Sequence, residues 1–504
     1  MSNANQKEIL RATSLIGGAS FLSIVAGLLK IKFLALLFGP VGVGVAGLLT
    51  SIMVAWSTAL GLGLRTSGAR QLAADLNDGK LFYTVRFTLF SVHLVLGLLG
   101  LSIGLIFSHQ IAGYVFNGSV SSFDVKLISI GVFFALIGAS QTAQLQGLRL
   151  IPQLAKVKVY SSIISAVLGC LTIWLYGKQS IPIFVIFVPI ITCLIAYKYT
   201  PKLSFNSDNR ASFTDFFSRF KLMLSLGVVF MLSGVITTGN QFLVRYLIME
   251  NYGAESVGIF QASWAISITY VGFILASMGT DYFPRLTEVI QNKNKVTSLI
   301  NDQTQIAIMF AAPVFIIMLT FSEYIIELLY SSEFRSASEI LRWQILGDVF
   351  KLISWALAFV ILAKAKSVLF LATEVIWNVL YVSLVYLGFE FWGVNSTGYA
   401  FAVSYFIYFL LIYRIVIGLW GFGFSRENKV LSIWLLLASI LIIFTGFYSS
   451  LLSLLVGSAV SLIFICYSLE KLGTLNVNSS KIKLLLTKYH QLKEIAFGVF
   501  GNRL

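Results

Sequence analysis

Long apolar stretches follow one another along most of the chain, and few charged residues interrupt them. A helix of ~20 apolar residues is needed to cross a bilayer core of ~30 Å. By this measure the sequence predicts fourteen membrane spans, at 12–38, 41–64, 86–107, 127–148, 159–176, 180–197, 222–249, 257–279, 304–330, 340–363, 367–388, 396–417, 431–448 and 450–468. The expected fold class is an all-α polytopic membrane protein.

Composition and motifs exclude several classes of protein. Hydrophobic residues make up 58% of the chain and charged residues 11%, whereas soluble domains contain roughly 45–50% and about 25%. These values exclude a soluble enzyme, a disordered chain and a nucleic-acid-binding protein. No two of the cysteines Cys170, Cys193 and Cys466 have the spacing of a disulfide framework or a metal site. Neither the metal-binding motif HExxH nor the nucleotide-binding motif GxxxxGK[ST] occurs. No disulfide, metal or nucleotide site is therefore expected. His93 is alone in its span, where we expect a satisfied polar group.

Basic residues are distributed unevenly between the connections. The chain has 36 Lys and Arg residues and a net charge of +15, and 28 of the 36 lie in one alternating set of loops and in the two termini. Basic loops remain in the cytoplasm. The sequence therefore predicts an even number of spans in an inner-membrane-type protein, with both termini on the cytoplasmic side.

A weak internal repeat relates the two halves of the chain. The sequence G-P-V-G-V-G at 39–44 reappears in outline as G-A-E-S-V-G at 253–258, so that glycines match at an offset of 214 residues. Six spans separate the copies, which predicts a parallel repeat of two six-helix lobes. The expected divisions are an N-lobe at 1–197, a cytoplasmic linker at 198–221, a C-lobe at 222–418, two further helices at 419–468 and an amphipathic basic cytoplasmic tail at 469–504.

Three cations lie in the first helices of the two predicted lobes, two in one and one in the other. Lys30 and Lys32 are on the first span, and Arg245 corresponds to Ile31 in the repeat register. Ionisable residues inside spans usually face a cavity or a partner. Cations at one depth in both lobes favour an axial cavity for an anion, and the alternative is that they extend to the headgroups as anchors.

Charged residues of both signs occur in spans 10 and 11. Asp348 and Lys351 are spaced i,i+3 and can pair on one helix. Glu374, on the next antiparallel helix, could compete for Lys351. The arrangement is typical either of a self-neutralising pair or of a protonatable switch that couples transport to an ion gradient.

Several motifs are specific to one family. They are L-A-L-L-F-G-P-V-G-V-G at 34–44, V-G-I-F-Q-A-S at 257–263, W-Q-I-L-G-D-V-F-K at 343–351, and I-L-A-K-A-K with A-T-E-V at 361–366 and 372–375. With these motifs the chain resembles the Wzx-type lipid-linked oligosaccharide flippases of the multidrug/oligosaccharidyl-lipid/polysaccharide exporter superfamily. The likeness runs from about residue 9 to residue 417. The last two spans lie beyond it.

The resemblance implies a function and a set of site residues. It implies alternating-access export of an undecaprenyl-diphosphate-linked oligosaccharide, such as an O-antigen-type repeat unit of lipopolysaccharide, by a protein that is not an enzyme. The family pattern has a cation at Lys32, an arginine at Arg245, and charges that match Asp348, Lys351, Lys364 and Glu374; Lys30 is outside it. We therefore expect substrate binding by Lys32, Arg245 and Lys30, and ion coupling or gating by Asp348, Lys351 and Glu374.

The remaining expectations concern cofactors, partners and an alternative function. H⁺ or Na⁺ would be the coupling ion, and no other cofactor is expected. The protein partners would be the polymerase and chain-length proteins of the same pathway. The alternative is a drug or metabolite cation antiporter of the same superfamily, although its substrates would favour a carboxylate-lined cavity.

Overall fold

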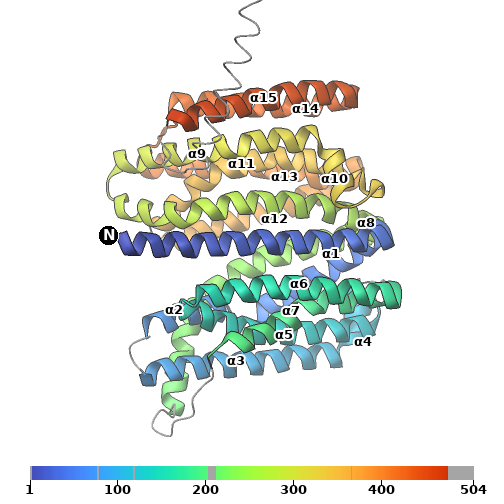
Figure 1. Ribbon diagram of the computed structural model, residues 1–504, viewed down its shortest axis with the longest axis vertical. Helices are drawn as coiled ribbons and strands as arrows, with labels where there is room; N and C mark the ends of the chain where they lie inside the picture. The colour runs from blue at the N-terminus through green and yellow to red at the C-terminus, as the bar shows by residue number, and fades with distance from the viewer. Residues whose placement is uncertain (1–2, 76–78, 117–119, 202–211, 365, 475–504) are drawn as a thin grey trace, which may run out of the picture. The chain divides into compact units, whose positions relative to one another are not determined.

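The structure is a computed structural model that describes residues 3–75, 79–116, 120–201, 212–364 and 366–474, and the regular elements in these residues are all helical. The helical class predicted from the sequence is confirmed. Figure 1 shows the helices in chain order: α1 (Asn3–Leu60), α2 (Leu64–Ala74), α3 (Gly79–Ile106), α4 (Ser108–Phe116), α5 (Ser122–Gly147), α6 (Ile151–Tyr176), α7 (Ile181–Tyr199), α8 (Phe213–Val289), α9 (Lys293–Thr320), α10 (Ser322–Leu329), α11 (Ala337–Ala363), α12 (Ser367–Trp392), α13 (Ser396–Trp420), α14 (Arg426–Tyr448) and α15 (Ser450–Thr474).

Within the described residues, ten helical segments are long and apolar enough to cross a membrane. Four of them contain 44 to 60 residues, which at 1.5 Å per residue is about twice the thickness of a bilayer core or more. Each of the four is interrupted by a glycine with positive φ, namely Gly39, Gly177, Gly253 and Gly393. Such a break allows one long segment to cross the membrane twice. The number of fourteen crossings stays a prediction.

The glycines that suggested the repeat break the helix in the same way. Gly39 in α1 has φ 57° and ψ −157°, and Gly253 in α8 has φ 79° and ψ 179°. Only glycine adopts this backbone region without a steric penalty. The offset of 214 residues found in the sequence therefore relates two equivalent breaks in the backbone.

Beyond these breaks, the two helices touch backbone to backbone. A Cβ atom on Gly44 would lie 1.9 Å from the carbonyl oxygen of Ala254, and one on Gly258 would lie 1.9 Å from the carbonyl oxygen of Pro40. The two contacts are related by the same offset, because Pro40 corresponds to Ala254 and Gly44 to Gly258. The repeat is thus expressed as a pseudosymmetric pair of contacts between α1 and α8.

Replacement of either glycine should destabilise the protein by a similar amount. We expect Gly44→Ala and Gly258→Ala each to lower the free energy of unfolding by about 1–3 kcal/mol, because the added methyl group forces two backbones apart. Thermal unfolding of the purified protein measures the effect. Gly239→Ala is the matched control, since a Cβ on this α8 glycine meets nothing within 4 Å. Equal midpoints in all three variants would contradict the close contact.

The chain divides into two compact units that do not follow its order. Unit 1 contains Met1–Ala265, Ile326–Ile340 and Glu374–Ala400, and within it α5 packs on α3 and α7, while α6 packs on α1 and α7. Unit 2 contains Ile266–Ile325, Leu341–Thr373 and Phe401–Leu504, and within it α9, α14 and α15 pack on one another. The last two predicted spans are therefore held by α9. The lobe boundaries at 1–197 and 222–418 stay predictions.

Two predicted cytoplasmic segments are described only in part. Residues 202–211 of the predicted linker lie outside the described residues, and residues 213–221 form the first turns of α8. This end of the predicted linker is thus continuous with the span that follows it. The predicted amphipathic tail lies outside the described residues from position 475 onward.

Candidate functional site

Lys30 lies inside the packing of α1, α6 and α7. Its Nζ donates a hydrogen bond of 2.8 Å to the carbonyl oxygen of Phe184 and is 4.0 Å from the centroid of the same phenyl ring. The residue is 8% exposed. A carbonyl dipole and a ring face therefore stabilise this cation, and no acidic side chain among the described residues pairs with it.

Lys32 follows two residues later but has a different environment. Its Nζ donates to the carbonyl oxygen of Leu328, at the end of α10. Residues two apart on a helix do not share a face. Lys30 and Lys32 therefore point to different neighbours, and the structure does not bring them together as one binding group.

Arg245 is the most deeply enclosed of the three predicted cations, with 4% of its surface exposed. Its Nε donates a hydrogen bond of 2.8 Å to Gln261 Oε1, and its Nη1 donates one of 2.6 Å to the carbonyl oxygen of Gln241. The guanidinium carbon is 5.4 Å from the ring centroid of Phe260 and 5.9 Å from that of Trp264. Arg245 is thus fixed by α8 itself, on both arms of its break at Gly253.

The partner of Arg245 lies at the contact between α1 and α8. A Cβ on Gly47 would be 3.0 Å from Gln261 Oε1, and these two residues correspond at the offset of 214. Because Gly47 has no side chain, the Gln261 amide fits beside α1 and reaches Arg245. Arg245 is therefore linked through the Gln261 amide to the contact between α1 and α8.

An aromatic group adjoins Arg245 in unit 1. Trp264 stacks on Tyr381 with ring centroids 6.1 Å apart, and Trp377 stacks on Tyr381 at 5.4 Å. These rings present flat apolar faces beside a cation. Such faces are common where proteins hold sugar rings or cations.

Asp348 and Lys351 form the predicted pair on α11, in unit 2. Asp348 is fully buried, and its Oδ2 accepts a hydrogen bond of 2.6 Å from the Ser267 hydroxyl. Lys351 Nζ is 3.8 Å from Asp348 Oδ1, which accepts no hydrogen bond from the described residues. Lys351 also lies 5.3 Å from the ring centroid of Tyr405. A buried carboxylate with one oxygen left without a donor is a suitable place for a proton or a small cation.

The other predicted charges have separate surroundings. Glu374 is half-buried on α12 and belongs to unit 1, whereas Asp348 and Lys351 belong to unit 2. Its competition for Lys351 stays a prediction. Lys364, which the family pattern also includes, lies 4.2 Å from the ring centroid of Trp420 in unit 2. Among the described residues, no three His, Cys, Asp or Glu side chains gather as a metal site.

Sequence reasoning missed the polar residues that position the charged ones. Gln261 and Ser267 are neutral residues of span 8, yet they supply the hydrogen bonds to Arg245 and Asp348. A signal was present, since glutamine is rare in a membrane span and Gln261 lies three residues after the repeat motif 253–258. The partner of each could not be read from the sequence.

Comparisons with known proteins agree on a family and a fold. A family model described as "Polysaccharide biosynthesis protein" matches residues 33–339, which is more than half of the chain. The Lipid III flippase of Escherichia coli (strain K12) is 22% identical over 414 residues, which cover 80% of this chain and 97% of that protein. The Lipid III flippase of Shigella flexneri gives the same values.

Solved structures are similar over most of their length. The Lipid II flippase MurJ in an inward closed conformation superposes with a TM-score of 0.71 and 17% identity, covering 91% of this chain and 99% of that one. A multidrug resistance MATE family transporter of the MOP superfamily, in an inward-facing conformation, gives a TM-score of 0.67 and 17% identity, covering 79% and 95%. The likeness confirms the predicted all-helical polytopic membrane fold.

Proposed function

Because the chain belongs to the polysaccharide biosynthesis protein family, we propose that it is a flippase for lipid-linked oligosaccharides in a bacterial inner membrane. Its substrate would be an undecaprenyl-diphosphate-linked oligosaccharide, such as an O-antigen-type repeat unit, moved from the cytoplasmic to the periplasmic leaflet. The similarity to a Lipid III flippase over 97% of that protein supports the proposal. The polymerase and chain-length proteins of the same pathway would be its protein partners.

Physical chemistry gives a reason for such a protein. Each sugar hydroxyl that enters hydrocarbon without a hydrogen bond costs ~4–8 kcal/mol. An oligosaccharide therefore cannot cross the membrane core unaided. A helical protein with polar groups inside its spans removes this barrier, while the polyprenyl tail remains in lipid.

The observation that carries the proposal is the buried guanidinium of Arg245 within a membrane span. A cation inside a span costs roughly 2.5–3.5 kcal/mol on insertion scales. Within the described part of the chain, Arg245 has hydrogen-bond partners but forms no ion pair with an acidic residue. An arginine fork suits a diphosphate. Lys32 would assist it, and Lys30, whose amine is held by Phe184, would contribute positive charge from further away.

Ion coupling would be the role of the second charged group. Asp348 would bind H⁺ or Na⁺, and Lys351 and Glu374 would respond to its charge by pairing or separating. The membrane potential would add to the driving force, because outward movement of an anion gains ~2.3 kcal/mol per charge per 100 mV. With the basic loops inside, both termini would be cytoplasmic.

Reconstitution tests the proposal directly. Purified protein in liposomes should move a fluorescent lipid-linked oligosaccharide between leaflets well above the rate in protein-free liposomes, measured by its accessibility to an external quencher. The alternative is a cation antiporter, which the fold similarity to a MATE transporter also supports. Uptake of a cationic dye against an opposing ion gradient, without movement of the lipid, would replace the flippase proposal by this alternative.

A further inference from the structure

A cavity of about 370 Å³ with a mixed polar and apolar lining lies within unit 1, apart from the residues discussed above. It is bounded by α1, α2, α3, α5 and α8, at the turn between α1 and α2. Its volume is in the range of small-molecule sites. The cavity is lined by Ser57, Thr58, Arg65, Thr66, His93 and Phe230, among others.

His93 lines this cavity and has a ring nitrogen without a hydrogen-bond partner among the described residues. The residue is fully buried, and its Nδ1 lies 2.7 Å from the carbonyl oxygen of Leu89. A carbonyl oxygen can only accept, so Nδ1 carries the hydrogen and, in the neutral ring, Nε2 is the acceptor. Nε2 is buried and has no hydrogen-bond partner among the described residues. The sequence led us to expect a satisfied polar group, and only one of its two nitrogens is satisfied.

Arg65 provides hydrogen-bond donors to the same cavity, in contrast to the acceptor of His93. Arg65 is exposed and also lines the cavity. It forms neither an ion pair nor a hydrogen bond with any described residue. The surrounding protein lowers the pKa of its guanidinium from the ordinary value by desolvation. A partly desolvated arginine without an acidic partner favours binding of a phosphate through its paired N–H donors.

The local fold holds these two residues in place. In the turn before Arg65, Leu62 and Gly63 have φ of 49° and 65°, and a Cβ on Gly63 would lie 2.0 Å from the carbonyl oxygen of Gly227 in α8. A bulky residue with positive φ is strained, and such strain is concentrated at functional sites. The turn is therefore fixed against α8 by backbone contact.

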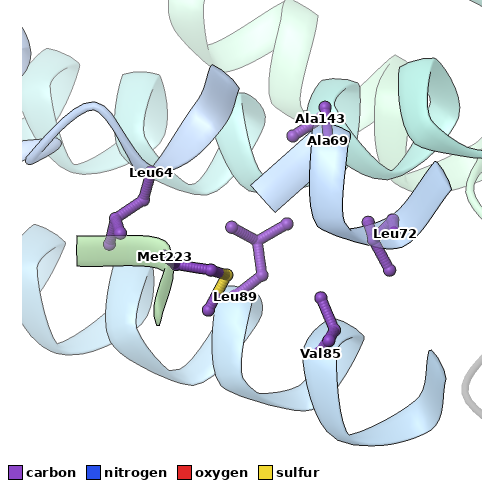
Figure 2. Close-up of a cluster of buried hydrophobic side chains, with 7 residues drawn as sticks. All are labelled: Leu64, Ala69, Leu72, Val85, Leu89, Ala143 and Met223. Carbon is purple, nitrogen blue, oxygen red and sulfur yellow. The ribbon is translucent and has the colours of Figure 1, made fainter. Parts of the chain in front are cut away.

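A cluster of buried apolar side chains completes this support (Figure 2). Leu64, directly before Arg65, belongs to the cluster together with Leu89, whose carbonyl holds His93, and Met223 of α8. The donor at the mouth and the acceptor inside are thus anchored to the same packed group. The backbone of Arg65 and the ring of His93 are thereby positioned, and two polar groups of opposite type define the ligand better than either alone.

We propose, on the basis of the proposed function, that this cavity binds the sugar phosphate of the lipid-linked substrate before transport. Arg65 binds a phosphate oxygen pair, and His93 Nε2 accepts a hydrogen bond from a hydroxyl or acetamido N–H of the adjoining sugar. Phosphate oxygens mainly accept hydrogen bonds, so a bare phosphate suits Arg65 better than His93, and an uncharged sugar leaves Arg65 without an anion. The ligand is therefore a sugar phosphate, at the end of the helices that the basic loops assign to the cytoplasm.

Binding to the full chain in lipid nanodiscs tests the proposal. The probes are N-acetylglucosamine 1-phosphate, inorganic phosphate and N-acetylglucosamine, titrated by calorimetry. We expect Arg65→Ala to weaken binding of both phosphates at least tenfold. We expect His93→Phe to weaken the sugar phosphate at least tenfold and inorganic phosphate by less than twofold. His93→Gln retains an acceptor and should restore most of the sugar phosphate affinity.

Matched controls separate the cavity from the surface. Arg70→Ala removes an exposed arginine of the same helix, and His109→Phe removes an exposed histidine of α4; both should bind as the wild type does. Equal affinity of Arg65→Ala and Arg70→Ala, or of His93→Phe and His109→Phe, would overturn the inference. A thermal unfolding midpoint measured for each variant identifies any that do not fold, and the Gln variant then decides for His93.

Two further experiments identify the source of the ligand and separate the cavity proposal from the proposed function. A short-chain polyprenyl diphosphate N-acetylglucosamine should compete with the soluble sugar phosphate if the lipid-linked substrate uses the cavity, and lack of competition would overturn its assignment to that substrate. Wild-type protein that flips lipid-linked oligosaccharide, with unchanged flipping in Arg65→Ala and His93→Phe, would refute the cavity alone. Sugar phosphate binding without any flipping by the wild type would refute the proposed function alone.

Discussion

Arg245→Ala is expected to lower the rate of lipid-linked oligosaccharide export by about tenfold to a hundredfold while leaving the protein in the membrane. A hydrogen bond to a charged group contributes about 1.5–3 kcal/mol, and 1.4 kcal/mol corresponds to a factor of ten. Arg245→Lys should retain part of the activity, because the charge survives and the planar fork does not. The measurements are the initial rate in liposomes and the surface glycan of cells that lack the native protein.

The controls for Arg245 separate binding from stability. Gln261→Leu removes the acceptor of its 2.8 Å hydrogen bond and should reduce export less than Arg245→Ala, because the guanidinium remains but is less well positioned. Arg335→Ala is the matched control, since its side chain is 62% exposed. Full export by Arg245→Ala at normal protein level would make Arg245 a structural residue that ties the two arms of α8 together.

Asp348→Asn is expected to abolish the response of export to an ion gradient. Wild-type protein in liposomes should accelerate severalfold when a proton or sodium gradient is imposed, and the Asn variant should have one rate in all conditions. The carboxylate is fully buried, with Ser267 on one oxygen and Lys351 3.8 Å from the other. An amide has no charge to exchange with a proton or a sodium ion, so occupancy of the site can no longer follow the gradient.

Two comparisons make the Asp348 result decisive. Asp302→Asn changes an exposed carboxylate of α9 in the same unit and should leave the gradient response intact. Asp348→Asn should also bind the lipid diphosphate as tightly as the wild type, because Arg245 is unchanged. Wild-type flipping at one rate with or without either gradient would show that Asp348 and Lys351 are a structural pair.

The sequence predicted those features that depend on local pattern. Apolar length identified the helices, and the glycine motifs at 39–44 and 253–258 identified the breaks, because a positive φ requires the same residue type in both copies. The Asp348–Lys351 pair followed from i,i+3 spacing on one helix. In each case, the residues that determine the feature lie within a few positions of one another.

Features that depend on distant neighbours were beyond the sequence. Lys30 and Lys32 look equivalent in the chain, but one meets Phe184 and the other Leu328, more than 150 and almost 300 residues away. His93 seemed unremarkable because its free nitrogen matters only once Arg65 and α8 enclose a cavity around it. The burial of a polar group, which decides its chemistry, is a property of the packed helices.

The glycine contacts at the two ends of one helix have a mechanical consequence. The second half of α1 touches α8 through Gly44 near one end, and the turn after its other end touches α8 through Gly63 and Gly227. These contacts join bare backbones, and a Cα–H···O contact contributes only ~0.5–1 kcal/mol. Each of these two backbone contacts therefore costs little to separate.

A helix held by one weak contact near each end can pivot about either contact. With one contact held, a tilt of ~10° in a helix ~30 Å long displaces the free end by ~5 Å. The helices themselves then contribute little to the preference for either tilt, so the balance is set by what occupies the sites between them. A methyl group on either glycine would act as a wedge, and would bias that balance in a molecule with no substrate bound.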